Sequence, residues 1–236
     1  MKKNLLLLLL FISICSCTEN TREIRDPQML NQEDSLRASL NIQIMNFTEI
    51  DSSGILIFPL QMGQNKNRRN EYDYKEMSYS NYWNIIFYNS KTSEYHLLTE
   101  EKVIINQFDY QYDERSGTGL DKYMFYEVTK KDFNEDKLLT GKDPVYLFVS
   151  DKEGKNFRQI SPSDTSLDKW KYIKSSGKII MNVTKDSNKN LLFDDKDEVS
   201  TFELVLELNE VPVEIFSDSL KDKLRMLYNR DWKRIK

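Results

Sequence analysis

The chain carries Val128-Thr129-Lys130-Lys131-Asp132-Phe133-Asn134-Glu135-Asp136-Lys137-Leu138-Leu139-Thr140-Gly141-Lys142-Asp143 and, further along, Val183-Thr184-Lys185-Asp186-Ser187-Asn188-Lys189-Asn190-Leu191-Leu192-Phe193-Asp194-Asp195-Lys196-Asp197. Counted from the first Asp, each copy has Asp at place one, Asn at three, Asp or Asn at five, an apolar residue at eight, Thr or Asp at nine and Asp at twelve. That is the ligand order of a calcium loop. The duplication also indicates an internal repeat.

Calcium is therefore the cofactor that the pattern suggests, because oxygen atoms on alternate residues can surround a hard cation. Two departures count against it: Lys137 and Leu191 stand where Gly is expected at place six, and Asp replaces the Glu of place twelve. A solvated turn held by Asx bonds is the alternative. The candidate ligands are Asp186, Asn188, Asn190, Asp194, Asp197 and Glu198 in the later copy, and Asp132, Asn134, Asp136, Thr140 and Asp143 in the earlier one.

Short β-branched and aromatic runs ending in Asn, Asp, Ser or Gly dominate the chain after residue 40, which predicts strands. They fall into three sets of four: 41–49, 54–62, 82–89 and 94–99; then 102–112, 121–130, 144–150 and 156–161; then 167–173, 177–185, 200–208 and 211–216. Each Asp loop lies between the second and third strands of its set. We therefore expect an all-β fold of three four-stranded, blade-like antiparallel sheets over residues 41–216.

One segment resembles a TolB-type β-propeller repeat: Val145 to Pro162 (VYLFVSDKEGKNFRQISP), followed by Leu167-Asp168-Lys169-Trp170 and Gly177-Lys178-Ile179-Ile180. The family's usual Ser-Pro-Asp-Gly after the Trp is replaced here by Lys171 to Gly177. The resemblance implies propeller blades, but three blades do not close a ring of four to eight. The sets could splay into an open stack, two chains could combine as a homodimer, or loops could hide further strands. An immunoglobulin-like sandwich is the competing all-β arrangement.

The first residues predict export. Lys2 and Lys3 precede an apolar run from Leu5 to Ile14 that is too short for a transmembrane helix. Ile14-Cys15-Ser16-Cys17 resembles a bacterial lipobox, which implies a lipoprotein signal peptide over 1–16 and a lipid on Cys17. A plain secretory signal is the alternative. Residues 17–40 are polar and resemble a tether. The expected location is the cell envelope, with the lipid as the membrane anchor and the outer membrane as the favoured site.

Charge argues against nucleic acid as a partner. The formal net charge of the 236 residues is −4, and removing Lys2 and Lys3 changes it to −6. Only Cys17 would remain of the two cysteines after processing, so no disulfide would form within the chain.

The tail, residues 217–236, predicts an amphipathic helix, with Leu220, Leu224, Leu227, Tyr228 and Ile235 at helical spacing and a basic opposite face. We expect its Leu face to pack against an end blade. A helix lying on a membrane surface is the alternative.

The remaining candidates for chemistry are one histidine, a group of aromatic side chains and the carboxylates. His96 is the only histidine and has no nucleophile signature beside it, so we expect a structural role. Aromatic side chains of Tyr72, Tyr74, Tyr82 and Trp83 are candidates for a ligand surface. No pattern singles out a catalytic pair among the carboxylates.

These observations favour a non-enzymatic, lipid-anchored envelope protein that binds a protein or glycan partner and is stabilised by calcium. The alternative is an envelope hydrolase that uses carboxylate catalysis.

Overall fold

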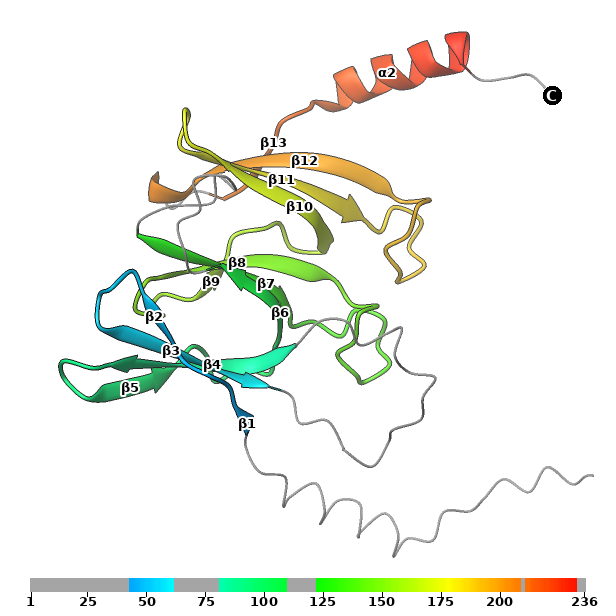
Figure 1. Cartoon of the computed structure of the whole chain (residues 1–236). Coiled ribbons are helices and arrows are strands. Elements are labelled where there is room, and N and C mark those ends of the chain that lie inside the picture. The colour runs from blue at the N-terminus through cyan, green and yellow to red at the C-terminus, as the bar shows by residue number, and fades with distance from the viewer. Residues whose placement is uncertain (1–42, 62–80, 110–121, 209–210, 233–236) are drawn as a thin grey trace, which may run out of the picture. The chain divides into compact units, whose positions relative to one another are not determined.

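In the computed structural model, the described residues are 43–61, 81–109, 122–208 and 211–232, all within one unit, Ile42–Lys236. The signal peptide, Cys17, the tether, Tyr72 and Tyr74, for which the sequence makes predictions, lie outside these residues. What is described is mostly β-strand with one helix near the C-terminus, as expected (Figure 1).

The strands form three antiparallel meanders that match the three predicted sets closely. The first meander consists of β2 (Thr48–Ile50), β3 (Ile55–Gln61), β4 (Tyr82–Asn89) and β5 (Glu94–Leu97), and β1 (Gln43–Ile44) also pairs with β3. The second consists of β6 (Ile104–Asp109), β7 (Tyr123–Thr129), β8 (Val145–Asp151) and β9 (Arg158–Gln159). The third consists of β10 (Thr165–Ile173), β11 (Lys178–Lys185), β12 (Glu198–Val205) and β13 (Val213–Glu214), with the 3₁₀ turn η2 (Leu206–Leu208) after β12.

The prediction of three separate four-stranded sheets is wrong. Tyr82 pairs with Ile105, and this single bridge joins the first two meanders into one nine-stranded sheet, while the third forms a four-stranded sheet. The reason is the shortness of β5, which pairs only with Ile86–Asn89 of β4 and leaves the backbone at Tyr82 open to β6. Neither sheet closes on itself within the described residues.

The meanders nevertheless stack as layers, as Figure 1 shows. We call the side of a meander that faces the preceding meander its front, and the side that faces the following one its back. The front of the first meander and the back of the third are their two outer sides. The second meander is apolar on both sides because alternate residues of a strand point to opposite faces. Its front contributes Met124, Tyr126, Val128, Tyr146 and Phe148 to one core, and its back contributes Phe125, Leu147 and Val149 to another.

The neighbouring meanders complete these two cores. The back of the first meander supplies Ile57, Ile85 and Phe87, and the front of the third supplies Ile179, Met181 and Val183. All six are at most 1% exposed, as expected where sheets pack face to face.

The helix α2 (Asp218–Asp231) confirms the predicted C-terminal helix. Ser217 caps it, because its side chain accepts the N–H of Leu220 at 3.4 Å. The expected packing of its Leu face against a blade is wrong, since α2 buries no residue and Leu224 is exposed. Polar contacts hold α2 instead: the Lys221 ammonium bonds Glu198 at 2.8 Å and also bonds Glu214.

The turn between β8 and β9 fits closely against the first meander. Gly154 has φ +77°, and a Cβ added there would lie 2.4 Å from ring atoms of Phe87. Phe87 is buried in the core, so its ring cannot yield cheaply.

Gly154→Ala should therefore destabilise the fold by about 3 kcal/mol or more, because steric overlap is added to a strained backbone. Gly177→Ala separates the two effects: its φ is +66° with open space around it, and the expected cost is about 1 kcal/mol. Gly141→Ala, with neither constraint, should be neutral. Urea unfolding of the three variants measures this order, and equal losses for Gly154→Ala and Gly177→Ala would contradict the close packing.

Candidate functional site

The two Asp loops connect equivalent strands, β7 to β8 and β11 to β12. Each loop has the same pattern of internal hydrogen bonds. In both, the carboxylate at place one accepts the N–H groups of places five and six, at 3.1 and 2.7 Å on Asp132 and at 3.1 and 3.0 Å on Asp186. The side-chain oxygen at place three, on Asn134 or Asn188, accepts the N–H of place five at 3.1 or 2.9 Å. The side chain at place five accepts the N–H of place seven at 2.9 Å in each loop.

The backbone at place six is left-handed in both loops even though neither residue is Gly. Lys137 has φ +69° and Leu191 has φ +61°. Place four is left-handed too, at Glu135 and Lys189. The missing Gly, which weakened the calcium interpretation in the sequence, therefore does not change the conformation. The N–H groups bonded to the Asp at place one hold this conformation against its steric cost of about 1–2 kcal/mol per residue.

The Asp at place twelve closes each loop. Asp143 is buried and accepts the N–H groups of places two and nine, at 2.9 and 2.8 Å. Asp197 accepts the equivalent groups at 3.0 and 3.1 Å. The N–H groups of Asp194 and Ser187 hold the pKa of Asp197 below its usual range, opposed by partial desolvation. The acidic side chains thus tie each loop together through hydrogen bonds to its own backbone.

The two loops also touch each other. The rings of Phe133, at place two of the first loop, and Phe193, at place eight of the second, have centroids 4.7 Å apart. Loops of successive meanders therefore lie side by side, as a repeat requires. The equivalent connection of the first meander, residues 62–80, falls outside the described residues.

Metal ligation remains a prediction. No group of three or more His, Cys, Asp or Glu side chains suited to a metal ion occurs among the described residues. Each loop would have to rely on Asn, Thr or backbone oxygens as well as on three carboxylates, or four in the later loop if Glu198 takes part. A carboxylate oxygen that accepts one N–H retains a second lone pair, so the bonds described above do not exhaust the acceptor capacity of the loops.

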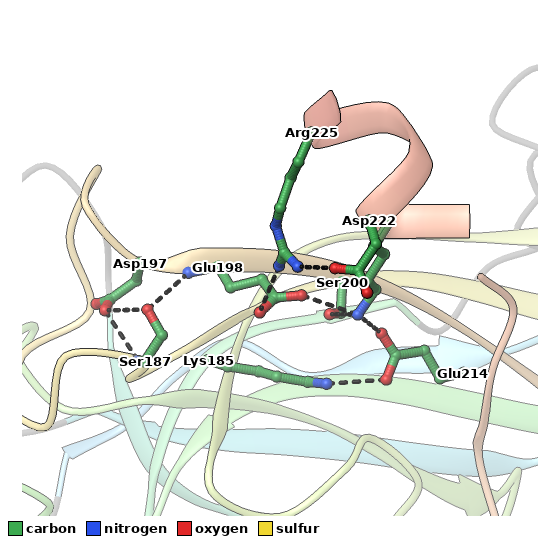
Figure 2. Close-up of polar contacts among 9 residues, drawn as sticks. Lys185, Ser187, Asp197, Glu198, Ser200, Glu214, Asp222 and Arg225 are labelled. Carbon is green, nitrogen blue, oxygen red and sulfur yellow. Dashed lines mark hydrogen bonds and ion pairs between the residues drawn. The ribbon is translucent and has the colours of Figure 1, made fainter. Parts of the chain in front are cut away.

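Glu198, the outermost candidate ligand, is engaged by α2 instead (Figure 2). Its carboxylate bonds Lys221 at 2.8 Å and lies 3.7 Å from Arg225, and the hydrogen bond from Lys221 is the main reason its pKa is lowered. Glu214 accepts from Lys221 and Lys185, which lowers its pKa to about 2. Ser187 joins this cluster to the loop, since its hydroxyl accepts the N–H of Glu198 and bonds Asp197, each at 3.2 Å.

The remaining sequence candidates are separated from the loops. His96 lies on β5, stacked on Phe87 with centroids 5.5 Å apart. Tyr82 packs against the first core and meets Phe108 edge to face at 5.6 Å, so its ring is engaged in the fold. Trp83 is half-buried.

A cleft between the second and third meanders, about 310 Å³ in volume, brings together carboxylates that no sequence pattern marks. Asp109, Glu127 and Asp168 line it with Trp170, beside β-bulges in β6 and β10. Burial raises the pKa of Glu127, and a hydrogen bond from the Trp170 indole N–H at 3.2 Å opposes that rise. A register shift in each strand creates this juxtaposition, and periodicity alone does not reveal it.

Comparison with known proteins finds no matching family and no matching curated protein. In the part of the chain that the structure describes, no helix has the length and apolar character needed to cross a bilayer.

Proposed function

We propose that this chain is a non-enzymatic, lipid-anchored protein of the bacterial envelope whose stacked meanders dock a protein partner, with calcium bracing the two Asp loops. The lipid on Cys17 would hold it to the outer membrane. The observation that carries the docking surface is the exposed, apolar front of the first meander.

The repeat explains why this surface is unusual. Within the chain, the front of one meander packs on the back of the meander before it, once in each core. Among the described residues no meander precedes the first one, yet its front resembles the other two fronts in composition. It carries Phe47, Leu56, Phe58, Ile86, Tyr88, Tyr95 and Leu97.

Several of these side chains are open to solvent. Tyr95 is 75% exposed and Phe47 is 62% exposed, while Leu56, Phe58 and Ile86 are half-buried. A contiguous apolar patch of this kind marks an interaction site more often than a free surface. Aromatic side chains are also enriched at the centres of protein interfaces.

The opposite end of the stack differs. The back of the third meander mixes Ile180 and Val199 with polar groups that bond one another, including the Lys178–Glu203 ion pair at 2.8 Å and the Thr201–Asn182 hydrogen bond at 3.1 Å. Terminal repeats of a stack commonly have such a polar outer face. Of the two outer faces that the described residues form, the front of the first meander lacks such polar groups, so the partner is expected there.

The double substitution Phe47→Ser and Tyr95→Ser should abolish partner capture while leaving the fold intact, because both side chains are more than half exposed. Affinity capture from the envelope fraction of the native bacterium, followed by mass spectrometry and binding with the purified partner, measures this. Val199→Ser, which removes a 59% exposed apolar side chain at the other end, is the matched control. If the double variant captures the partner as well as Val199→Ser does, the front of the first meander is not the docking surface. Light scattering shows whether a second copy of the chain is the partner.

Calcium should raise the melting temperature of the purified chain, because a ligand that binds only the folded state stabilises it, by about 2.7 kcal/mol at a hundredfold excess over its dissociation constant. Asp186→Ala should lower the basal midpoint, through two lost hydrogen bonds, and also reduce the calcium increment. Asp195→Ala, in the same loop but at no ligand place, should keep the increment. An unchanged midpoint at millimolar calcium would refute the metal proposal for both loops.

A glycoside hydrolase is the second candidate, favoured by the cleft that holds Asp109, Glu127 and Asp168. Such enzymes pair a carboxylic acid of raised pKa with a second carboxylate. Release of reducing ends from envelope polysaccharides, lost in Glu127→Gln, would establish it. If the wild-type protein releases no reducing ends, the hydrolase candidate is excluded and the binding proposal remains.

A further inference from the structure

A second cleft, about 530 Å³ in volume, opens between the first and second meanders at their last strands. β5 and the residues just after it form one wall, and the turn and strand from Gly154 to Gln159 form the other. Its volume lies in the range of small-molecule sites, about 300–1,000 Å³. Leu97 lines the cleft and also belongs to the apolar front, so the two regions share an edge along β5. His96 pairs with Phe87 on the back side of β5, whereas Tyr95 and Leu97 pair with front residues, so the imidazole faces away from the apolar front.

The floor of the cleft is rigid and apolar. Phe148 and Phe157 stack with centroids 4.7 Å apart, and Phe157 meets Tyr126 edge to face at 5.3 Å. Phe148 and Tyr126 belong to the first core. The floor of the cleft is therefore continuous with the packed first core.

The charges that line the cleft are mainly positive: Lys130, Lys155 and Arg158 against Glu101. Lys155 is neutralised by Glu153 at 2.6 Å. The Lys130 ammonium lies over the Phe148 ring at 5.3 Å and is 3.7 Å from the exposed Glu101, a long ion pair of little strength. The backbone of Arg158 pairs with Val149, but its guanidinium makes no hydrogen bond or ion pair with any other described residue. The positive charges of Lys130 and Arg158 are therefore balanced weakly or not at all by neighbouring carboxylates.

His96 adds an unsatisfied polar atom. Its Nε2 is buried, and it is the one buried side-chain nitrogen or oxygen among the described residues that has no hydrogen-bond partner. Stacking on Phe87 fixes the imidazole plane, so the ring cannot turn freely toward solvent. Because Nε2 is closed to solvent in this arrangement, His96 serves the cleft as a fixed wall whose imidazole is sensitive to a bound charge, and not as a hydrogen-bond donor.

We infer that this cleft binds a small ligand bearing an oxyanion, either a carboxylate or a phosphate. Lys130 and Arg158 supply the positive charge, and the His96 imidazole forms part of the wall beside them. The body of the ligand lies against Phe157. A cationic ligand would meet the excess positive charge, and a neutral one would leave it uncompensated, so both should bind more weakly.

His96 provides the test because it is the only histidine in the chain. In a ¹⁵N-labelled sample, long-range proton–nitrogen spectra show one imidazole, whose shifts report directly on the cleft. We expect saturable shifts with glucuronate or with inorganic phosphate, and none with glucose. The two acids distinguish a carboxylated sugar from a phosphorylated ligand.

Lys130→Gln should weaken the apparent affinity about tenfold, as expected for one lost charge-assisted hydrogen bond. Lys122→Gln removes an exposed lysine that is paired with Glu207 and lies outside the cleft, so it should leave the affinity unchanged. No shift of the His96 signals with either acid, or equal affinity in Lys130→Gln and wild type, would overturn the inference. The result is independent of partner capture by the apolar front.

Discussion

Burial of the second meander on both faces is the constraint on which the rest of the structure depends. Residues of β7 and β8 alternate between two cores, so Tyr126 and Phe148 pack toward the first meander while Phe125 and Leu147 pack toward the third. Each outer meander buries one face against this middle layer. The buried Tyr126 hydroxyl bonds Ser150 at 2.7 Å, which satisfies a polar group inside the first core. Without the middle layer, neither outer meander has a partner in the described chain.

The functional candidates follow from this layering. A stack of repeats has two ends, and here the ends differ: the polar back of the third meander is compatible with solvent, whereas the apolar front of the first is the surface proposed for a partner. Two clefts of opposite character lie between successive layers, one beside the first strands β6 and β10 and the other beside the last strands β5 and β9. One gathers carboxylates beside Trp170, and the other gathers cations beside His96. The paired Asp loops lie on connections between middle strands, where they contact each other through Phe133 and Phe193.

Local chemistry explains which predictions succeeded. Strands, turns and the helix depend on nearest neighbours, so β-branched runs and a Ser cap located nearly every described element. The equivalence of the two Asp loops was visible for the same reason. The requirement for Gly at place six was too strict, because hydrogen bonds to the Asp at place one stabilise a left-handed Lys137 and Leu191. The Leu face of α2 was assigned to a blade because amphipathic spacing shows that a face exists, but not what covers it.

The amino-acid sequence by itself determined the twelve strands of the three meanders, the repeat and the helix, because alternation of side chains and turn chemistry act over a few residues. Only the tertiary structure decided that one bridge at Tyr82 and Ile105 merges two meanders into a single sheet. It alone placed Glu127 near Asp168, and His96 near Lys130. These pairs come from different meanders and depend on bulges, register and the short β5, which are set by packing between layers rather than by residues close in the chain.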